Sequence, residues 1–124
     1  MIIGIGTDFM KMSSITDESL QAGDPFREKM FTANEQEQAE IRSIPGDYFR
    51  TRFAAKEAVF KTLRVDPDHV RLNEIEILDD ENGAPHVTLY GALKKCADEK
   101  KIQTIHISIT YDDGYVQAFA VSEG

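Results

Sequence analysis

The chain is poor in cysteine, tryptophan and proline, and it contains no long apolar run. Its 124 residues include one cysteine, no tryptophan and four prolines. A single thiol can form neither an internal disulfide nor a cysteine-based zinc site, so the composition favours a reducing compartment. No apolar run approaches the ~18 residues of a membrane span, and the first residues lack the basic start and long apolar segment of a signal peptide. We therefore expect a cytoplasmic protein.

Basic residues are also scarce. Fourteen Lys and Arg residues stand against 22 Asp and Glu residues, which gives a formal net charge of -8. Because phosphate backbones bind basic surfaces, this balance argues against general binding of nucleic acid. Five of the basic residues nevertheless fall in one short stretch: Arg50, Arg52, Lys56, Lys61 and Arg64. The stretch predicts a cationic patch that binds an anion.

The length and composition suit one folded domain over residues 1–124. With 41% hydrophobic and 29% charged residues, the chain can bury one modest core but not two. Helices are expected at residues 13–23, 32–43, 47–63 and 91–101, the second opened by a Thr32–Glu35 capping box and the third capped by Asp47. Strands are expected at residues 1–7, 74–78, 86–89, 104–110 and 115–122. This order predicts an α+β fold with a mainly antiparallel sheet packed with helices.

Two carboxylates could carry chemistry. Gly4 and Gly6 clear one face of the first strand, which suggests that another part of the chain approaches the backbone there, and Asp8 ends that face. Glu57 lies on the basic helix. Mg²⁺ uses such oxygen ligands and completes its shell with water and substrate phosphates. Equally, Asp8 could be a turn or cap residue and Glu57 the i,i+4 partner of Lys61.

Lys56 occupies an unexpected position on the same helix. At ~100° per residue, the apolar stripe of this helix contains Phe49, Phe53, Val59, Phe60 and Leu63, and Lys56 lies in its middle. On an ordinary amphipathic helix, such a lysine would extend its ammonium group to the surface. With Arg52 and Lys61 near it, a bound phosphate is the alternative explanation.

His106 lies on a strand whose isoleucines, Ile105, Ile107 and Ile109, point to one face. His106, Ser108 and Thr110 therefore point to the other. A polar strand face is usually solvated, and a lone histidine is more often structural than a ligand. Alternation alone thus leaves the role of His106 open.

Several motifs together resemble a known family. They are GIGTD at 4–8, TANE at 32–35, RFAAKEAVFKTL at 52–63, NGAP at 82–85 and IHISIT at 105–110. In order and spacing they resemble the short bacterial 4′-phosphopantetheinyl transferases, the holo-[acyl-carrier-protein] synthases. The resemblance implies transfer of the phosphopantetheine arm of coenzyme A (CoA) to a serine of apo acyl carrier protein, with release of adenosine 3′,5′-bisphosphate.

The resemblance also implies roles for individual residues. It assigns Asp8 and Glu57 to Mg²⁺ held against the CoA diphosphate, and Lys61 to a phosphate contact, so these three are the expected catalytic residues. The positions expected around CoA are Arg52, Lys56, Gly83, Pro85, His106 and Thr110, with His106 near the adenosine 3′-phosphate. Lys56 would then face a shared CoA cleft rather than the core. Either Glu57 or a metal-bound water could deprotonate the serine.

The family also implies a homotrimer with active sites at subunit interfaces. The chain departs from the family pattern at four positions: Lys11 replaces an acidic residue, Ser14 an arginine expected to dock the carrier, Ala84 a lysine and Tyr111 a histidine. Other cations, Arg27, Lys29, Arg50 and Arg52, could contact the carrier instead. The departures leave two further hypotheses: a non-catalytic CoA-binding or regulatory paralogue, and a purely structural oligomeric domain.

Overall fold

Two antiparallel sheets form the β-structure of the molecule. The computed structural model describes residues 1–124, apart from the side chain of residue 69. One sheet has the strand order β1-β5-β4, with β1 at Ile2–Lys11, β4 at Thr104–Asp112 and β5 at Tyr115–Glu123. The other is the hairpin of β2 (Ile75–Asp79) and β3 (Pro85–Leu89). Every pairing is antiparallel, which confirms the expected α+β class, although the strands divide between two sheets.

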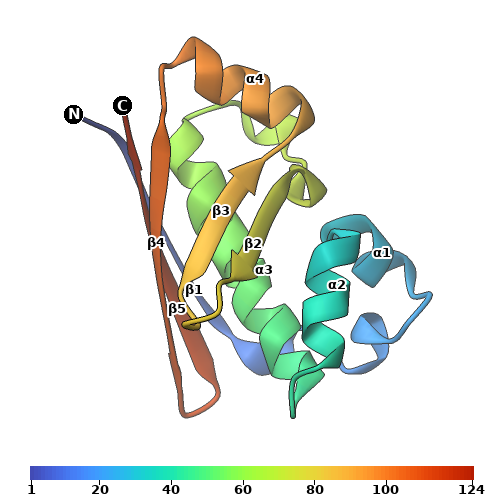
Figure 1. Cartoon of the computed structure of the whole chain (residues 1–124). Helices are drawn as coiled ribbons and strands as arrows, with labels where there is room; N and C mark the ends of the chain where they lie inside the picture. The colour runs from blue at the N-terminus through green and yellow to red at the C-terminus, as the bar shows by residue number, and fades with distance from the viewer.

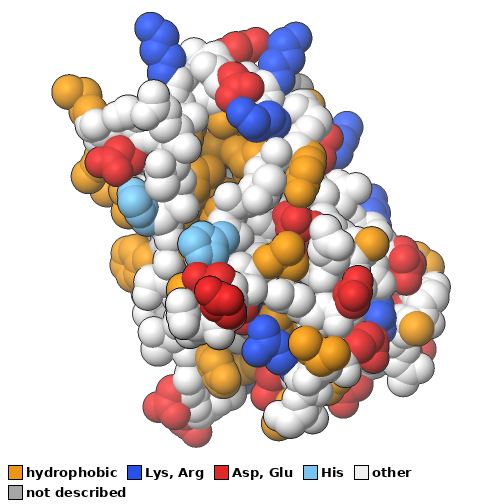
Figure 2. All heavy atoms as spheres, viewed as in Figure 1, with side chains coloured by type: hydrophobic (Ala, Val, Ile, Leu, Met, Phe, Trp, Pro, Cys, Tyr) orange, Lys and Arg blue, Asp and Glu red, His pale blue; other side chains and the backbone are white. Residues whose placement is uncertain are grey.

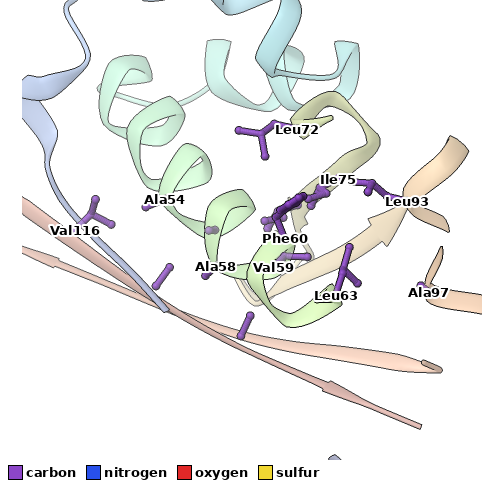
Figure 3. Packing of buried hydrophobic residues seen from close by; sticks show 14 of the residues in the cluster. Ala54, Ala58, Val59, Phe60, Leu63, Leu72, Ile75, Leu93, Ala97 and Val116 are labelled. Carbon is purple, nitrogen blue, oxygen red and sulfur yellow. The ribbon is translucent and has the colours of Figure 1, made fainter. Parts of the chain in front are cut away.

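The long helix α3 (Pro45–Leu63) runs between the three-stranded sheet and the β2–β3 hairpin (Figure 1). Its small side chains Ala54 and Ala58 lie on the side of the sheet, whereas Phe60 and Leu63 extend towards the hairpin and α4 (Gly91–Glu99) (Figure 3). Because burial of apolar surface drives folding, this helix is the centre of the main core. It also carries several of the candidate site residues.

The glycines of β1 let that strand pack directly on α3. A Cβ atom placed on Gly4 would lie 2.1 Å from the carbonyl oxygen of Thr62, and one on Gly6 would lie 2.0 Å from that of Ala58. Both distances are far below van der Waals contact, so no larger side chain fits. The expectation that another part of the chain approaches these glycines is confirmed, and that part is α3.

Two short helices cover the N-terminal end of α3. The helix α1 (Pro25–Met30) is capped by Asp24, whose side chain accepts a hydrogen bond from the backbone N–H of Phe26 at 2.9 Å. The helix α2 (Ala33–Glu40) begins with the expected reciprocal capping box of Thr32 and Glu35. This confirms the start of α2, which ends three residues earlier than expected.

The structure corrects two other expectations about helices. Residues 13–23 form no α-helix; the segment contains single 3₁₀ turns at Met12–Ser14 and Glu18–Leu20. Asp47 is not a helix cap, because α3 already begins at Pro45, whose fixed φ suits the first helical position. Among the helices that the structure describes, none is both long enough and apolar enough to cross a bilayer.

Candidate active site

Asp8 and Lys61 meet where β1 packs on α3. Gly4 lies next to Thr62 and Gly6 next to Ala58, so β1 runs antiparallel to the helix. Asp8 is the next residue on that face of the strand, so it lies one further step towards the start of α3. The Lys61 ammonium donates to the carbonyl oxygen of Thr7 at 2.9 Å and lies 3.4 Å from Asp8 Oδ1. Lys61 is half exposed, so its charge remains accessible to a ligand.

Glu57 lies within electrostatic range of the same pair. Partial burial raises the pKa of Glu57, the negative charge of Asp8 raises it further, and the positive charge of Lys61 opposes both effects. Lys61 makes its ion pair with Asp8; among the described side chains, none lies within 4.0 Å of Glu57 as an ion-pair partner. The structure thus brings Asp8, Glu57 and Lys61 together. It favours neither the cap explanation of Asp8, which lies inside a strand, nor the helix-pair explanation of Glu57.

The acidic pair could hold a divalent cation. Because the negative charge of Asp8 raises the pKa of Glu57, a cation placed between the two carboxylates would stabilise the ionised form of Glu57. No group of three or more His, Cys, Asp or Glu side chains among those described could hold a metal by itself. This donor set suits Mg²⁺, which commonly takes one or two carboxylates and fills its other positions with water and phosphate oxygens.

A cleft of about 560 Å³ opens between the start of α3, the turn of the hairpin and β4. Three residues predicted to contact CoA line it: Arg52, Gly83 and Pro85. Tyr111, one of the departures from the family pattern, also lines it, as do several residues that sequence reasoning missed, among them Arg42, Tyr48 and Asp79. The cleft combines two guanidinium groups, two carboxylates, hydroxyl groups and apolar walls, a lining that suits a ligand with both polar and apolar parts.

A second groove, of about 530 Å³, lies between β3, β4 and α4. Figure 2 shows apolar side chains in the hollow on this face. Pro85 and Ile107 line both the cleft and this groove, so the two are adjacent, and His106 lies on the groove. His106 Nε2 is 2.9 Å from Glu123 Oε1. Thr110 lines neither opening and lies exposed on β4.

Lys56 is in the core, which contradicts the expectation that it faces an open CoA cleft. The residue is fully buried. Its ammonium donates to the carbonyl oxygens of Met30, Leu72 and Ile75 at 2.7–2.9 Å and pairs with Glu35 Oε1 at 2.5 Å. All three ammonium hydrogens are thus engaged inside the chain. The carbonyl and carboxylate acceptors, rather than a phosphate, explain a lysine in an apolar stripe.

The expected cationic patch is also not continuous. Arg50 and Arg52 are buried like Lys56, and each is paired with an aspartate. Arg50 donates to the carbonyl oxygen of Ile15. Arg27, proposed as an alternative carrier contact, is buried against Glu40. Neither Arg27 nor Arg50 therefore presents an open charge to a carrier.

The candidate residues divide between two sides of the chain. Asp8 belongs to β1, one edge of the three-stranded sheet, whereas Ile107 and Tyr111 of the cleft belong to β4, the other edge. The strand β5 separates them. The acidic site and the arginine-containing cleft are therefore two separate places on one chain.

Comparisons with known proteins identify the family of the chain. A family model described as the 4′-phosphopantetheinyl transferase superfamily matches residues 4–120. The chain is 33% identical to a holo-[acyl-carrier-protein] synthase of Halothermothrix orenii, covering 99% of this chain and 98% of that protein. The crystal structure of holo-[acyl-carrier-protein] synthase from Neisseria meningitidis matches with a TM-score of 0.86 at 31% identity, covering all of both chains.

A further solved structure is an ACPS–CoA complex from Chronobacterium ammoniagenes, which matches with a TM-score of 0.79 at 27% identity. That match covers 96% of this chain and 95% of the other. Because family profile, full-length relatives and whole-chain structures agree, this chain belongs to the holo-[acyl-carrier-protein] synthases, enzymes of the 4′-phosphopantetheinyl transferase superfamily.

Proposed function

We propose that this chain transfers the 4′-phosphopantetheine arm of CoA to a serine of an apo acyl carrier protein in a Mg²⁺-dependent reaction, releasing adenosine 3′,5′-bisphosphate. The convergence of Asp8, Glu57 and Lys61 beside β1 is the observation that carries the proposal. The names of the relatives and the CoA-bound structure of a family member support the substrates.

Asp8 and Glu57 would hold the Mg²⁺ ion, which when bound supplies positive charge to the diphosphate and its leaving group. Lys61 is half exposed and would orient a phosphate oxygen for in-line displacement. The candidates for accepting the serine proton are Glu57, in a state in which it does not coordinate the ion, and a water molecule beside the acidic pair. Positioning and electrostatics would supply most of the acceleration.

The assembly that we propose is a homotrimer with active sites between subunits. The acidic site and the arginine-containing cleft lie at opposite edges of one sheet, so a ring of subunits can bring the edge of one to the edge of the next. The outer face of that sheet exposes large apolar side chains: Ile5, Phe9, Tyr115 and Phe119. Phe9 and Tyr115 stack at 5.2 Å. Such an exposed apolar patch is typical of an interaction surface.

The direct test is a transfer assay. The protein is incubated with CoA, Mg²⁺ and apo carrier proteins from the same genome, and the carrier mass is followed. We expect a gain of the phosphopantetheine arm, and a fall of about 10²-fold or more with Asp8→Asn or Glu57→Gln, because each loses a ligand that stabilises developing charge. Asp98→Asn is the matched control, since it removes a carboxylate from an exposed pair on α4.

Three outcomes would contradict the proposal. CoA binding without transfer to any carrier would identify a non-catalytic CoA-binding paralogue. Normal turnover of Glu57→Gln would show that Glu57 is neither a metal ligand nor a base. If CoA did not bind at all, a structural role for the domain would be the remaining explanation.

A further inference from the structure

Asp79 binds both arginines of the cleft. Its Oδ1 lies 2.5 Å from Arg52 Nη2, and its Oδ2 lies 2.7 Å from Arg42 Nη2. Both guanidinium groups also lie over the ring of Tyr48, at 4.3 Å for Arg52 and 5.1 Å for Arg42. One carboxylate therefore joins two cations that come from different parts of the chain.

The Asp79 carboxylate does not accept hydrogen bonds from every donor of these arginines. Arg52 is almost completely buried, and its Nε has no hydrogen-bond acceptor among the described residues. A buried donor without an acceptor is costly, so Asp79 alone does not satisfy the Arg52 guanidinium group. Among the described residues, Asp79 is the one carboxylate within 4.0 Å of these two guanidinium groups, because Asp47, which also lines the cleft, lies beside Arg50 instead. Both features favour an additional anion.

The frame that holds Asp79 does not depend on its carboxylate. The Asp79 backbone N–H donates to Gln38 Oε1 at 3.0 Å, and Gln38 Nε2 donates to the Asp79 carbonyl oxygen at 3.0 Å. The Tyr48 hydroxyl donates to the same Gln38 oxygen at 2.6 Å. Asp79 also pairs with Pro85 in the β2–β3 ladder. The side-chain charge can therefore be changed while the backbone stays fixed.

We propose that Asp79 is an internal counter-anion that sets how strongly the cleft binds a phosphate group. In the ligand-free chain it neutralises part of the charge of Arg42 and Arg52. A phosphate in the cleft then shares these guanidinium groups with Asp79 and is repelled by its charge. Asp79 thereby weakens binding of the substrate and of the bisphosphate product, which favours product release.

This inference rests on the proposed function, because it takes CoA as the source of the phosphate. CoA carries a diphosphate and a separate ribose 3′-phosphate. The diphosphate is assigned to the acidic site with Asp8 and Lys61, so we assign the 3′-phosphate to the arginines, in the cleft that adjoins the groove of His106. Dephospho-CoA lacks only that phosphate and is the matched ligand for the test.

The experiment measures the dissociation constants of CoA and dephospho-CoA by calorimetry, with Mg²⁺, for the assembled wild-type protein and its variants. We expect Asp79→Asn to strengthen CoA binding by roughly tenfold, because a negative charge near the phosphate is removed. Its binding of dephospho-CoA should stay within a factor of about two. Asp79→Glu, which keeps the charge, should resemble the wild type, and so should Asp98→Asn.

Arg52→Gln should remove most of the preference for CoA over dephospho-CoA. Thermal unfolding of each variant is recorded in parallel, and Asp79→Ser replaces Asp79→Asn if the latter fails to fold. Unchanged or weaker CoA binding by the neutral variant, in a protein that still binds CoA and transfers its arm, would overturn the inference and leave the proposed function standing. Failure of the wild type to bind CoA would overturn both.

Discussion

At the scale of single residues, the Lys56 ammonium depends on groups from four separate segments. Its acceptors are the carbonyl oxygens of Met30, Leu72 and Ile75 and the carboxylate of Glu35. Burial lowers the pKa of Lys56 and raises that of Glu35, while the attraction within the pair opposes both shifts. Glu35 also accepts from the Ile77 N–H at 2.9 Å, which ties the pair to β2. The pair thus joins α2, α3 and the hairpin.

Removing Lys56 should therefore destabilise the fold severely. In Lys56→Met, Glu35 would remain buried without its cation and three carbonyl oxygens would lose their donor, so we expect a loss of about 3–5 kcal/mol in the free energy of unfolding. Denaturant titration measures it. Lys61→Met, four residues away from Glu57 on the helix surface, is the control and should cost less than about 1 kcal/mol. Equal losses in the two variants would contradict the core role of Lys56.

Replacing Glu57 by glutamine should instead stabilise the fold at high pH. Because its pKa is raised in the folded protein by burial and by Asp8, its contribution to stability is lost as pH rises through that pKa. Glu57→Gln cannot ionise. Without Mg²⁺, the variant should match the wild type at pH values below the ordinary glutamate pKa and become more stable than it as the pH rises above the folded-state pKa.

Thermal unfolding of the wild type and of Glu57→Gln across this pH range tests the prediction. Mg²⁺ should reduce the difference by stabilising the ionised pair of the wild type. A variant that was less stable than the wild type at neutral pH would show that the Glu57 carboxylate supports the fold.

At the scale of elements, the packing of β1 on α3 positions the acidic site. Gly6→Ala would place a Cβ atom 2.0 Å from a backbone oxygen, so strand and helix would have to separate. We expect a loss of roughly 1–3 kcal/mol in stability and reduced turnover, because Asp8 would move relative to α3. Chemical denaturation and the transfer assay measure the two effects.

Gly46→Ala is the control for this change. A Cβ atom there would lie 2.7 Å from Arg50 Nη1, a side-chain atom whose one ion pair, with Asp47, is 3.8 Å long, and 3.8 Å from Asp17 Oδ1. Gly46 lies in the first turn of α3, where alanine is favourable. This variant should therefore keep its stability and activity, and a similar loss in both variants would contradict the close-packing argument.

Local signals predicted most elements well. The Thr32–Glu35 capping box was visible because both partners lie within four residues, and the strands were visible from alternation. The helix predicted at residues 13–23 was wrong, because the buried residues of this segment, Ile15 and Leu20, anchor short turns rather than a helical face. The two-sheet arrangement depends on long-range pairing, for which the sequence carries no local signal.

The candidate site likewise has some features that the sequence predicted and others that it did not. The grouping of Asp8, Glu57 and Lys61 followed from the glycines of β1 and from the family motifs. The burial of Lys56 could not be predicted, because its acceptors come from positions 30, 35, 72 and 75. Asp79 was missed for a similar reason: its arginine partners lie 27 and 37 positions earlier in the chain.

At the scale of the whole molecule, the separation of the acidic site from the cleft allows a test of shared active sites. Asp8→Asn disables the acidic site and Arg52→Gln disables the cleft, each in every subunit. If one active site combines halves from two subunits, refolding an equal mixture should restore up to about a quarter of the wild-type sites. The transfer assay measures how much activity the mixture recovers. Activity no greater than that of the separate variants would show that each site lies within one chain.

The enclosure of the Lys56 amine has a consequence for chemical labelling. Amine-acylating reagents attack an accessible nitrogen, and in the native protein this nitrogen is fully buried and hydrogen-bonded. Lys56 should react only in molecules whose helices have come apart, whereas half-exposed Lys61 should react at once. The slow appearance of an acylated Lys56 peptide would therefore record how often the junction of α1, α2, α3 and β2 opens.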